Sequence, residues 1–169
     1  MRLASLEAVF RALNEAHVQY LVVGGVAVIA HGYVRFTQDL DLVVALAPEN
    51  AHRAMATLEQ LGYRPKIPVK ATDFADPEKR AAWIHDKRMM VFQLVSGAHP
   101  TVAIDVFVRE PFPFQSEWPR ALQHEVAPDL LVPVVSLETL LALKREANRP
   151  NDQQDVRMLT RQHGTGGTT

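Results

Sequence analysis

Residues 24–42 read G-G-V-A-V-I-A-H-G-Y-V-R-F-T-Q-D-L-D-L: two glycines follow the apolar run Y-L-V-V, and thirteen residues separate Gly25 from the motif D-L-D-L. Side chains alternate between the two faces of a β-strand, so Asp39 and Asp41 are predicted to share one face, with the leucines on the buried face. Two adjacent carboxylates repel each other unless a cation lies between them. Such oxygens suit Mg²⁺, whose shell is usually completed by phosphate and water. The segment therefore predicts a strand that holds a divalent metal ion.

Gly24 and Gly25 are predicted to lie in a turn between a strand and a helix. Glycine adopts backbone dihedrals that other residues avoid, and it lets the chain approach a ligand closely. The N-terminus of the following helix offers free N–H groups and a positive dipole to an anion such as phosphate. Considered alone, the glycine pair fits an ordinary tight turn equally well.

A third carboxylate, Asp105, lies in the apolar run I-D-V-F-V. An ionised aspartate inside an apolar strand also favours a bound cation. A phosphate-binding turn together with three carboxylates is the equipment of two-metal phosphoryl or nucleotidyl transfer. The alternative for these aspartates is a place on the solvent face of an edge strand or a half-buried strand, without a metal.

Two motifs resemble those of a known family. The glycine pair, its spacer and D-L-D-L resemble the signature of the DNA polymerase β-like nucleotidyltransferase superfamily. The wider stretch 24–42 is similar to the small bacterial abortive-infection (AbiEii-like) toxins. Residues 141–159, L-A-L-K-R-E-A-N-R-P-N-D-Q-Q-D-V-R-M-L, resemble the Lys…Arg…Asp…Asp motif of that group, with matches at Lys144, Arg149, Asp152 and Asp155.

The resemblance implies a role for individual residues. The catalytic and metal-binding residues are Asp39, Asp41 and Asp105, with Asp105 also helping to activate the attacking hydroxyl. The nucleotide-binding residues are Gly24, Gly25, Arg35, Thr37 and Lys144. The implied cofactor is Mg²⁺, as two ions, with Mn²⁺ as the alternative. From the residues alone, a solvated helix face remains the alternative for Lys144, pairing with an aspartate remains one for Arg35, and structural roles are favoured for Asp152 and Asp155.

The implied activity is transfer of an NMP from an NTP to an acceptor hydroxyl with release of pyrophosphate. The resemblance suggests the toxin of a toxin–antitoxin or phage-defence system, with tRNA as a candidate acceptor and an antitoxin as partner. A protein acceptor is less favoured. One alternative is an antibiotic nucleotidyltransferase of the aminoglycoside or lincosamide type. Another is a catalytically silent antitoxin or binding protein with the same fold.

Bulk composition limits these classes only weakly. The chain has 169 residues, no cysteine and a formal net charge of −1, which excludes disulfides and the overall basic charge of a protein that coats nucleic acid. No apolar run approaches the roughly 20 residues of a membrane span. We therefore expect a cytoplasmic protein, with one domain over residues 1–163 and a flexible tail at 164–169.

Apolar periodicity predicts helices and strands that alternate along the first half of the chain. Predicted helices cover 3–16, 26–31, 48–61, 78–85 and 136–147, and a last helix begins at 151 or 152 and ends at 163. Predicted strands cover 20–23, 38–46, 89–95, 101–108 and 130–135. Residues 63–77 and 109–125 are predicted to be irregular, with one helical turn in the second segment. This order predicts an α/β (α+β) protein with helices packed on a mixed β-sheet, and the resemblance implies the nucleotidyltransferase fold.

Overall fold

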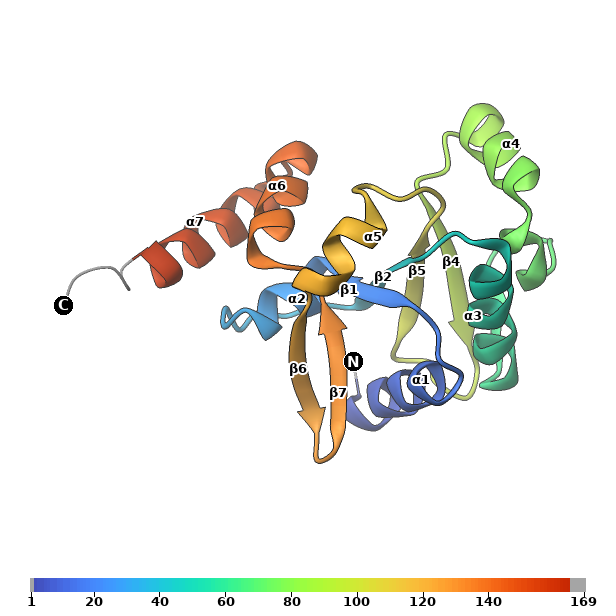
Figure 1. Ribbon diagram of the computed structural model, residues 1–169, viewed down its shortest axis with the longest axis horizontal. Helices are drawn as coiled ribbons and strands as arrows, with labels where there is room; N and C mark the ends of the chain where they lie inside the picture. The colour runs from blue at the N-terminus through green and yellow to red at the C-terminus, as the bar shows by residue number, and fades with distance from the viewer. Residues whose placement is uncertain (1, 165–169) are drawn as a thin grey trace.

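The computed structural model describes residues 2–164. Within this part of the chain, seven strands form one mixed sheet in the order β3-β4-β5-β2-β1-β7-β6 (Figure 1). The strands are β1 (Tyr20–Val23), β2 (Asp39–Val44), β3 (Tyr63–Pro65), β4 (Val91–Ser96), β5 (Ala103–Phe107), β6 (Leu122–Ala127) and β7 (Leu130–Val134). The predicted α/β fold with a mixed sheet is confirmed.

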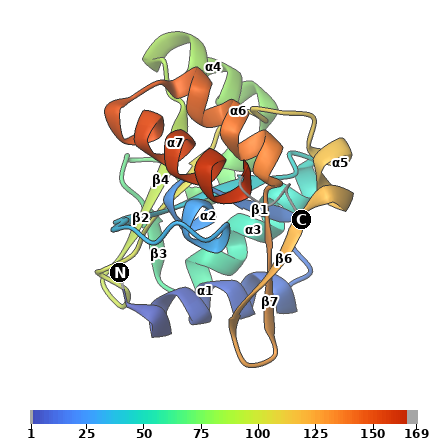
Figure 2. The ribbon, with the colours of Figure 1, turned by 90° about the vertical axis from the view of Figure 1, so that its left-hand side faces the viewer.

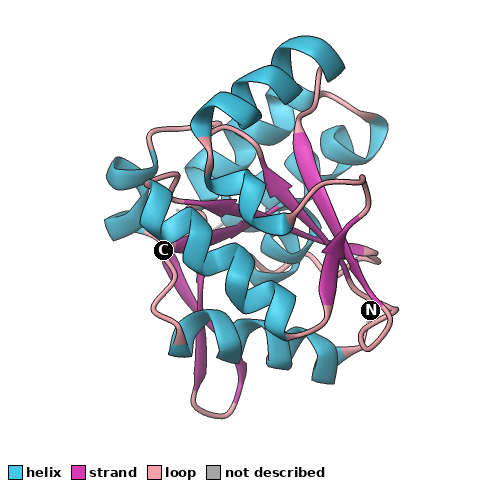
Figure 3. Ribbon diagram, turned by 90° about the vertical axis from the view of Figure 1, so that its right-hand side faces the viewer, coloured by secondary structure: helices cyan, strands magenta, loops and turns pink. Residues whose placement is uncertain are grey.

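Helices surround this sheet (Figure 3). They are α1 (Leu3–Glu15), α2 (Gly24–Ala30), α3 (Pro48–Gln60), α4 (Pro77–Lys87), α5 (Phe114–Glu117), α6 (Leu137–Ala147) and α7 (Pro150–Gly164), with short 3₁₀ turns at Ala71–Ala75 and Trp118–Arg120. The helix α1 packs against α3, and α6 packs against α7. Figure 2 shows α6 and α7 above the strands and α1 below them. The sheet is therefore the middle layer of the molecule.

The strand β2 lies at the centre of the sheet. It pairs antiparallel with β1 and parallel with β5. Leu40 and Leu42 are fully buried, whereas Asp39 and Asp41 are half-buried on the other face. The predicted alternation is thus confirmed, and the edge-strand alternative for the two aspartates is wrong.

Apolar residues at helical spacing in α1 form part of the hydrophobic core. Val9, Phe10 and Leu13 are wholly buried, because positions three and four apart share one face of a helix. The ring of Phe10 stacks on Tyr20 of β1 with centroids 6.2 Å apart. Burial of one such side chain contributes about 1.5–3 kcal/mol. This packing anchors β1, which leads directly into the glycine turn.

Three sequence predictions need correction. The segment 63–77, predicted to be loop, contains the edge strand β3, whose three residues are too few to show a period. The segment 109–125 contributes to β6, an edge strand whose exposed, mixed-polarity sequence carries no alternation signal. Pro150 begins α7 rather than preceding it, because proline lacks only a hydrogen bond that the first helical turn does not make.

Only part of the predicted tail at 164–169 can be compared with the structure. Gly164 is the last residue of α7, and the remaining residues of the predicted tail lie outside the described residues.

None of the helices within residues 2–164 has both the length and the apolar character needed to cross a membrane.

Candidate active site

Three aspartates from two neighbouring strands line one cavity of about 990 Å³. Asp39 and Asp41 come from β2, and Asp105 comes from β5. The parallel register places Asp41 directly opposite Asp105. Since neighbouring strands lie about 4.8 Å apart, these two carboxylates are adjacent. The structure thus brings all three predicted acidic residues to the same cavity.

Asp39, Asp41 and Asp105 form an acidic cluster. Burial and the charge of a neighbouring aspartate raise the pKa values of Asp41 and Asp105. Burial, and next the negative charge of Asp105, raise the pKa of Asp41 from 3.8 to about 6, against a hydrogen bond from the Gly25 backbone. Burial also raises the pKa of Asp105, and the charge of Asp39 acts in the same direction. A bound cation would offset both effects, because it favours the charged form of a carboxylate.

The donor atoms of this cluster are all carboxylate oxygens, which hard cations prefer. Within residues 2–164, no group of three His, Asp or Glu side chains is arranged closely enough to hold a metal ion by itself. Mg²⁺ does not require such a cage, since it is commonly bound by one or two carboxylates with substrate phosphates and water. The adjacent pair Asp41 and Asp105 therefore fits an ion that a nucleotide helps to bind.

The glycine turn presses against the acidic cluster. Gly24 has a φ of +64°, a left-handed conformation that favours glycine. A Cβ atom at Gly24 would overlap the Asp41 carboxylate, and one at Gly25 would overlap the Thr37 hydroxyl. The helix α2 begins at Gly24 rather than at the predicted residue 26. The first N–H groups of α2 consequently lie beside the Asp41 carboxylate. A tight turn with no role in the site would not need this close approach.

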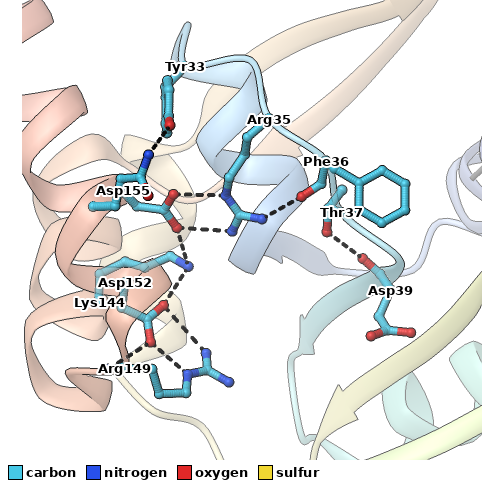
Figure 4. Close-up of polar contacts among 10 residues, drawn as sticks. Tyr33, Arg35, Phe36, Thr37, Asp39, Lys144, Arg149, Asp152 and Asp155 are labelled. Atoms are coloured by element: carbon cyan, nitrogen blue, oxygen red, sulfur yellow. Dashed lines mark hydrogen bonds and ion pairs between the residues drawn. The ribbon is translucent and has the colours of Figure 1, made fainter.

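Arg35 and Thr37 also line the cavity. Arg35 donates to both oxygens of Asp155, from Nε at 2.8 Å and from Nη2 at 2.9 Å. Its Nη1 donates to the carbonyl oxygen of Phe36 at 2.8 Å (Figure 4). The Thr37 hydroxyl donates to the Asp39 carbonyl oxygen at 3.4 Å. Arg35 is therefore paired with an aspartate of α7 and not with the acidic cluster of the cavity.

Lys144 of α6 is buried rather than part of a solvated helix face, with 7% of its side chain exposed. Its Nζ contacts Asp152 at 2.8 Å and Asp155 at 2.9 Å. Asp152 in turn accepts a hydrogen bond from Arg149 Nε at 2.6 Å. The ion pairs form one chain in the order Arg35, Asp155, Lys144, Asp152, Arg149 (Figure 4). This ion-pair chain links the loop between α2 and β2 to α6 and α7.

The helix α7 contacts the loop between α2 and β2 at further points. Gln154 Nε2 donates to the Tyr33 hydroxyl at 3.0 Å. Gln162 Nε2 donates to the Gly32 carbonyl oxygen at 3.4 Å. Together with the pairing of Asp155 and Arg35, these contacts fix the loop that leads into the strand of the two aspartates.

Sequence reasoning missed Gln93. This residue of β4 pairs in register with Asp105, and its Nε2 donates to Asp105 Oδ1 at 2.8 Å. The available signal was an amide within the apolar run V-F-Q-L-V, on the same alternation as the strand's solvent face. Without the strand pairing, that signal does not identify Asp105 as the partner.

The model of a family described as "Nucleotidyl transferase AbiEii toxin, Type IV TA system" matches residues 7–163. The chain belongs to this AbiEii nucleotidyltransferase family. It is therefore a nucleotidyltransferase, and the predicted family and enzyme class are confirmed.

Solved structures share the fold of this AbiEii family member. The crystal structure of ANT(2")-Ia in complex with adenylyl-2"-tobramycin is 17% identical, with a TM-score of 0.62 over 96% of this chain and 90% of that one. The lincomycin-bound lincosamide antibiotic adenylyltransferase LnuA is 16% identical, with a TM-score of 0.62 over 93% of this chain and 95% of that one. No curated protein matches the sequence.

Proposed function

We propose that this nucleotidyltransferase transfers an NMP from an NTP to an acceptor hydroxyl and releases pyrophosphate, with Mg²⁺ as cofactor. One observation carries the proposal: the turn at Gly24 lies against Asp41, which is in turn the register partner of Asp105. A turn that can bind phosphate and a carboxylate pair that can bind a cation are therefore adjacent.

Each group has a distinct role in this proposal. The turn at Gly24 and Gly25 binds phosphate oxygens at the start of α2. Asp39, Asp41 and Asp105 hold two Mg²⁺ ions, for which Mn²⁺ is the alternative. When bound, these ions neutralise charge on the phosphates and polarise the attacked phosphoryl group. Thr37 and the cationic residues Arg35 and Lys144 complete the nucleotide pocket.

The proposed step is an in-line displacement. An oxygen of the acceptor forms a bond to the α-phosphorus as the bond to the bridging oxygen of the β-phosphate breaks. Pyrophosphate leaves with that electron pair, and Asp105 takes the proton of the acceptor hydroxyl. Most of the rate enhancement comes from positioning and charge neutralisation.

We favour tRNA as the acceptor and an antitoxin as the partner, both in the cytoplasm. The family is described as a toxin of a type IV toxin–antitoxin system, which suits a cellular acceptor better than a drug. The rim of the cavity also carries Phe36, which is 73% exposed, and Met90. The exposed ring of Phe36 suits stacking against an unpaired base.

An antibiotic acceptor is the second candidate. It is favoured by the fold shared with ANT(2")-Ia and LnuA over most of both chains. The catalytically silent alternative is disfavoured, because all three carboxylates meet in one cavity beside the glycine turn.

The test uses α-³²P-labelled ATP, CTP, GTP and UTP in separate reactions. Each contains the protein, Mg²⁺ and either total RNA, tobramycin or lincomycin, with an Asp39→Ala/Asp41→Ala double mutant beside the wild type. Label in RNA of tRNA size with the wild type alone is the expected result. Label in the antibiotics instead selects the second candidate, and absence of label from every acceptor refutes the proposal.

A further inference from the structure

The buried lysine of the cavity already has anionic partners. Lys144 Nζ lies within 2.9 Å of two carboxylates, Asp152 and Asp155. All three side chains are almost completely buried. A phosphate could bind this ammonium group only in competition with two fixed negative charges.

Arg149 is arranged in the opposite way. Its side chain is 74% exposed and lines the cavity. One edge of the guanidinium is fixed by Asp152, through Nε at 2.6 Å and Nη2 at 3.4 Å. A guanidinium has five N–H donors, so the remaining donors are available on the other edge. Within residues 2–164, no hydrogen bond of Nη1 to a protein group is found.

Arg149 lines the same cavity as Asp39, Asp41 and Asp105. The negative charge of Asp41 contributes to raising the pKa of Arg149, after the larger effect of the Asp152 hydrogen bond. Figure 4 shows the guanidinium at the end of the ion-pair chain, on the side of Asp39. An anion between the carboxylate-bound cations and Arg149 would therefore have positive charge on two sides.

We propose that Arg149 is the residue that contacts the terminal phosphates of the bound NTP, while Lys144 is a positioning residue. Lys144 holds Asp152, and Asp152 directs Arg149 towards the cavity. Lys144 also holds Asp155, which fixes Arg35. This inference rests on the proposed function, because it assigns the phosphate contacts of the same site. It replaces a direct contact of Lys144 with the nucleotide by an indirect role.

The test measures binding of inorganic tripolyphosphate and of orthophosphate by calorimetry, with and without Mg²⁺. The proteins are the wild type, Arg149→Ala, Arg149→Lys and Arg145→Ala. Arg145 is a matched control, since it is an exposed arginine of α6 that does not line the cavity. Circular dichroism confirms that each variant is folded.

We expect Arg149→Ala to weaken tripolyphosphate binding about tenfold or more, because a hydrogen bond to a charged group is worth that much. Orthophosphate binding should change less, Arg149→Lys should restore part of the affinity, and Arg145→Ala should match the wild type. Equal affinity in Arg149→Ala and wild type overturns the inference, as does a wild type that does not bind tripolyphosphate.

A Lys144→Met variant separates the two residues. We expect it to lower the melting temperature more than Arg149→Ala does, because it leaves the buried Asp152 and Asp155 without their shared partner. If folded Lys144→Met loses more affinity than Arg149→Ala, the direct contact belongs to Lys144 and the inference is wrong. Arg149-dependent binding without any nucleotidyl transfer supports the phosphate site and counts against the proposed function alone.

Discussion

Asp41 and Asp105 are register partners across the parallel strands β2 and β5. Because the two strands are not consecutive in the chain, their pairing places two carboxylates from distant segments on one face of the sheet. The arrangement costs stability, since like charges lie close together in a partly buried setting. It is expected of a site whose charge is balanced by a ligand.

Replacing Asp41 by asparagine separates catalysis from folding. We expect Asp41→Asn to reduce nucleotidyl transfer by more than about 100-fold, because it removes transition-state charge stabilisation. The same change should raise the melting temperature of the metal-free protein at pH 7.5, because it removes the repulsion with Asp105. Activity assays and thermal melts in EDTA measure the two effects. A variant that is both less active and less stable would show that Asp41 supports the fold.

The pH dependence of stability should carry the signature of the same cluster. Folding raises the pKa of Asp41 from 3.8 to about 6, so the folded state binds the proton more tightly than the unfolded state. The resulting stabilisation is complete below about pH 4 and is lost as the pH rises through about 6. Denaturant titrations in EDTA from pH 4.5 to 7.5 should show this loss in the wild type relative to Asp41→Asn. A constant difference between the two proteins would refute the prediction.

Replacing Gln93 by methionine keeps its size but removes the donor to Asp105 Oδ1. We expect kcat to fall about tenfold while KM for the NTP changes little, since the amide fixes the carboxylate that takes the acceptor proton. Gln123→Met is the matched control, because Gln123 lies exposed on the edge strand β6 and does not line the cavity. A rise in KM with unchanged kcat would instead place Gln93 in nucleotide binding.

Two glycine-to-alanine variants test the turn. At Gly24 an added Cβ meets the Asp41 carboxylate at a φ of +64°, whereas at Gly97 it meets nothing within 4 Å. We expect Gly24→Ala to cost more than about 1 kcal/mol of stability and to abolish NTP binding. Gly97→Ala should retain both. Denaturant titrations and calorimetry with each NTP supply the measurements, and intact NTP binding by Gly24→Ala would contradict the assigned phosphate turn.

Removing the Asp155 carboxylate should be the most destabilising of these changes. Asp155 is completely buried and receives both Arg35 and Lys144, so Asp155→Ala leaves Arg35 without a carboxylate partner and leaves Lys144 with Asp152 alone. We expect a loss of about 3–5 kcal/mol in the free energy of unfolding. Asp86→Ala, at an exposed position of α4, is the control and should change it by less than about 0.5 kcal/mol. A small effect of Asp155→Ala would show that the ion-pair chain adds little to folding.

The aspartates of the site could be predicted because their signals are local. The period of two in D-L-D-L assigns both carboxylates to one face, and apolar neighbours make Asp105 conspicuous within its strand. The glycine pair is likewise a short-range signal, since the turn depends on the residues that form it. Local patterns of this kind can be recognised in the sequence without knowing the order of the strands in the sheet.

The partners of these residues could not be predicted, because they depend on long-range pairing. Arg35 and Asp155 are 120 positions apart, and Gln93 meets Asp105 only through the register of β4 and β5. The strand β6 was missed for a related reason. An exposed edge strand does not need a regular apolar face, so the pattern that reveals a buried strand is absent.

The ion-pair chain between α7 and the loop before β2 also sets an order of events during synthesis. A ribosome produces Asp39, Asp41 and Asp105 before Lys144, Arg149 and Asp155, and chains begin to fold from the N-terminal side. The three carboxylates of the cavity therefore emerge first, and Lys144 and Arg149 follow only with α6 and the turn into α7. An enzyme of a toxin family is thus kept incomplete while its chain is still being translated.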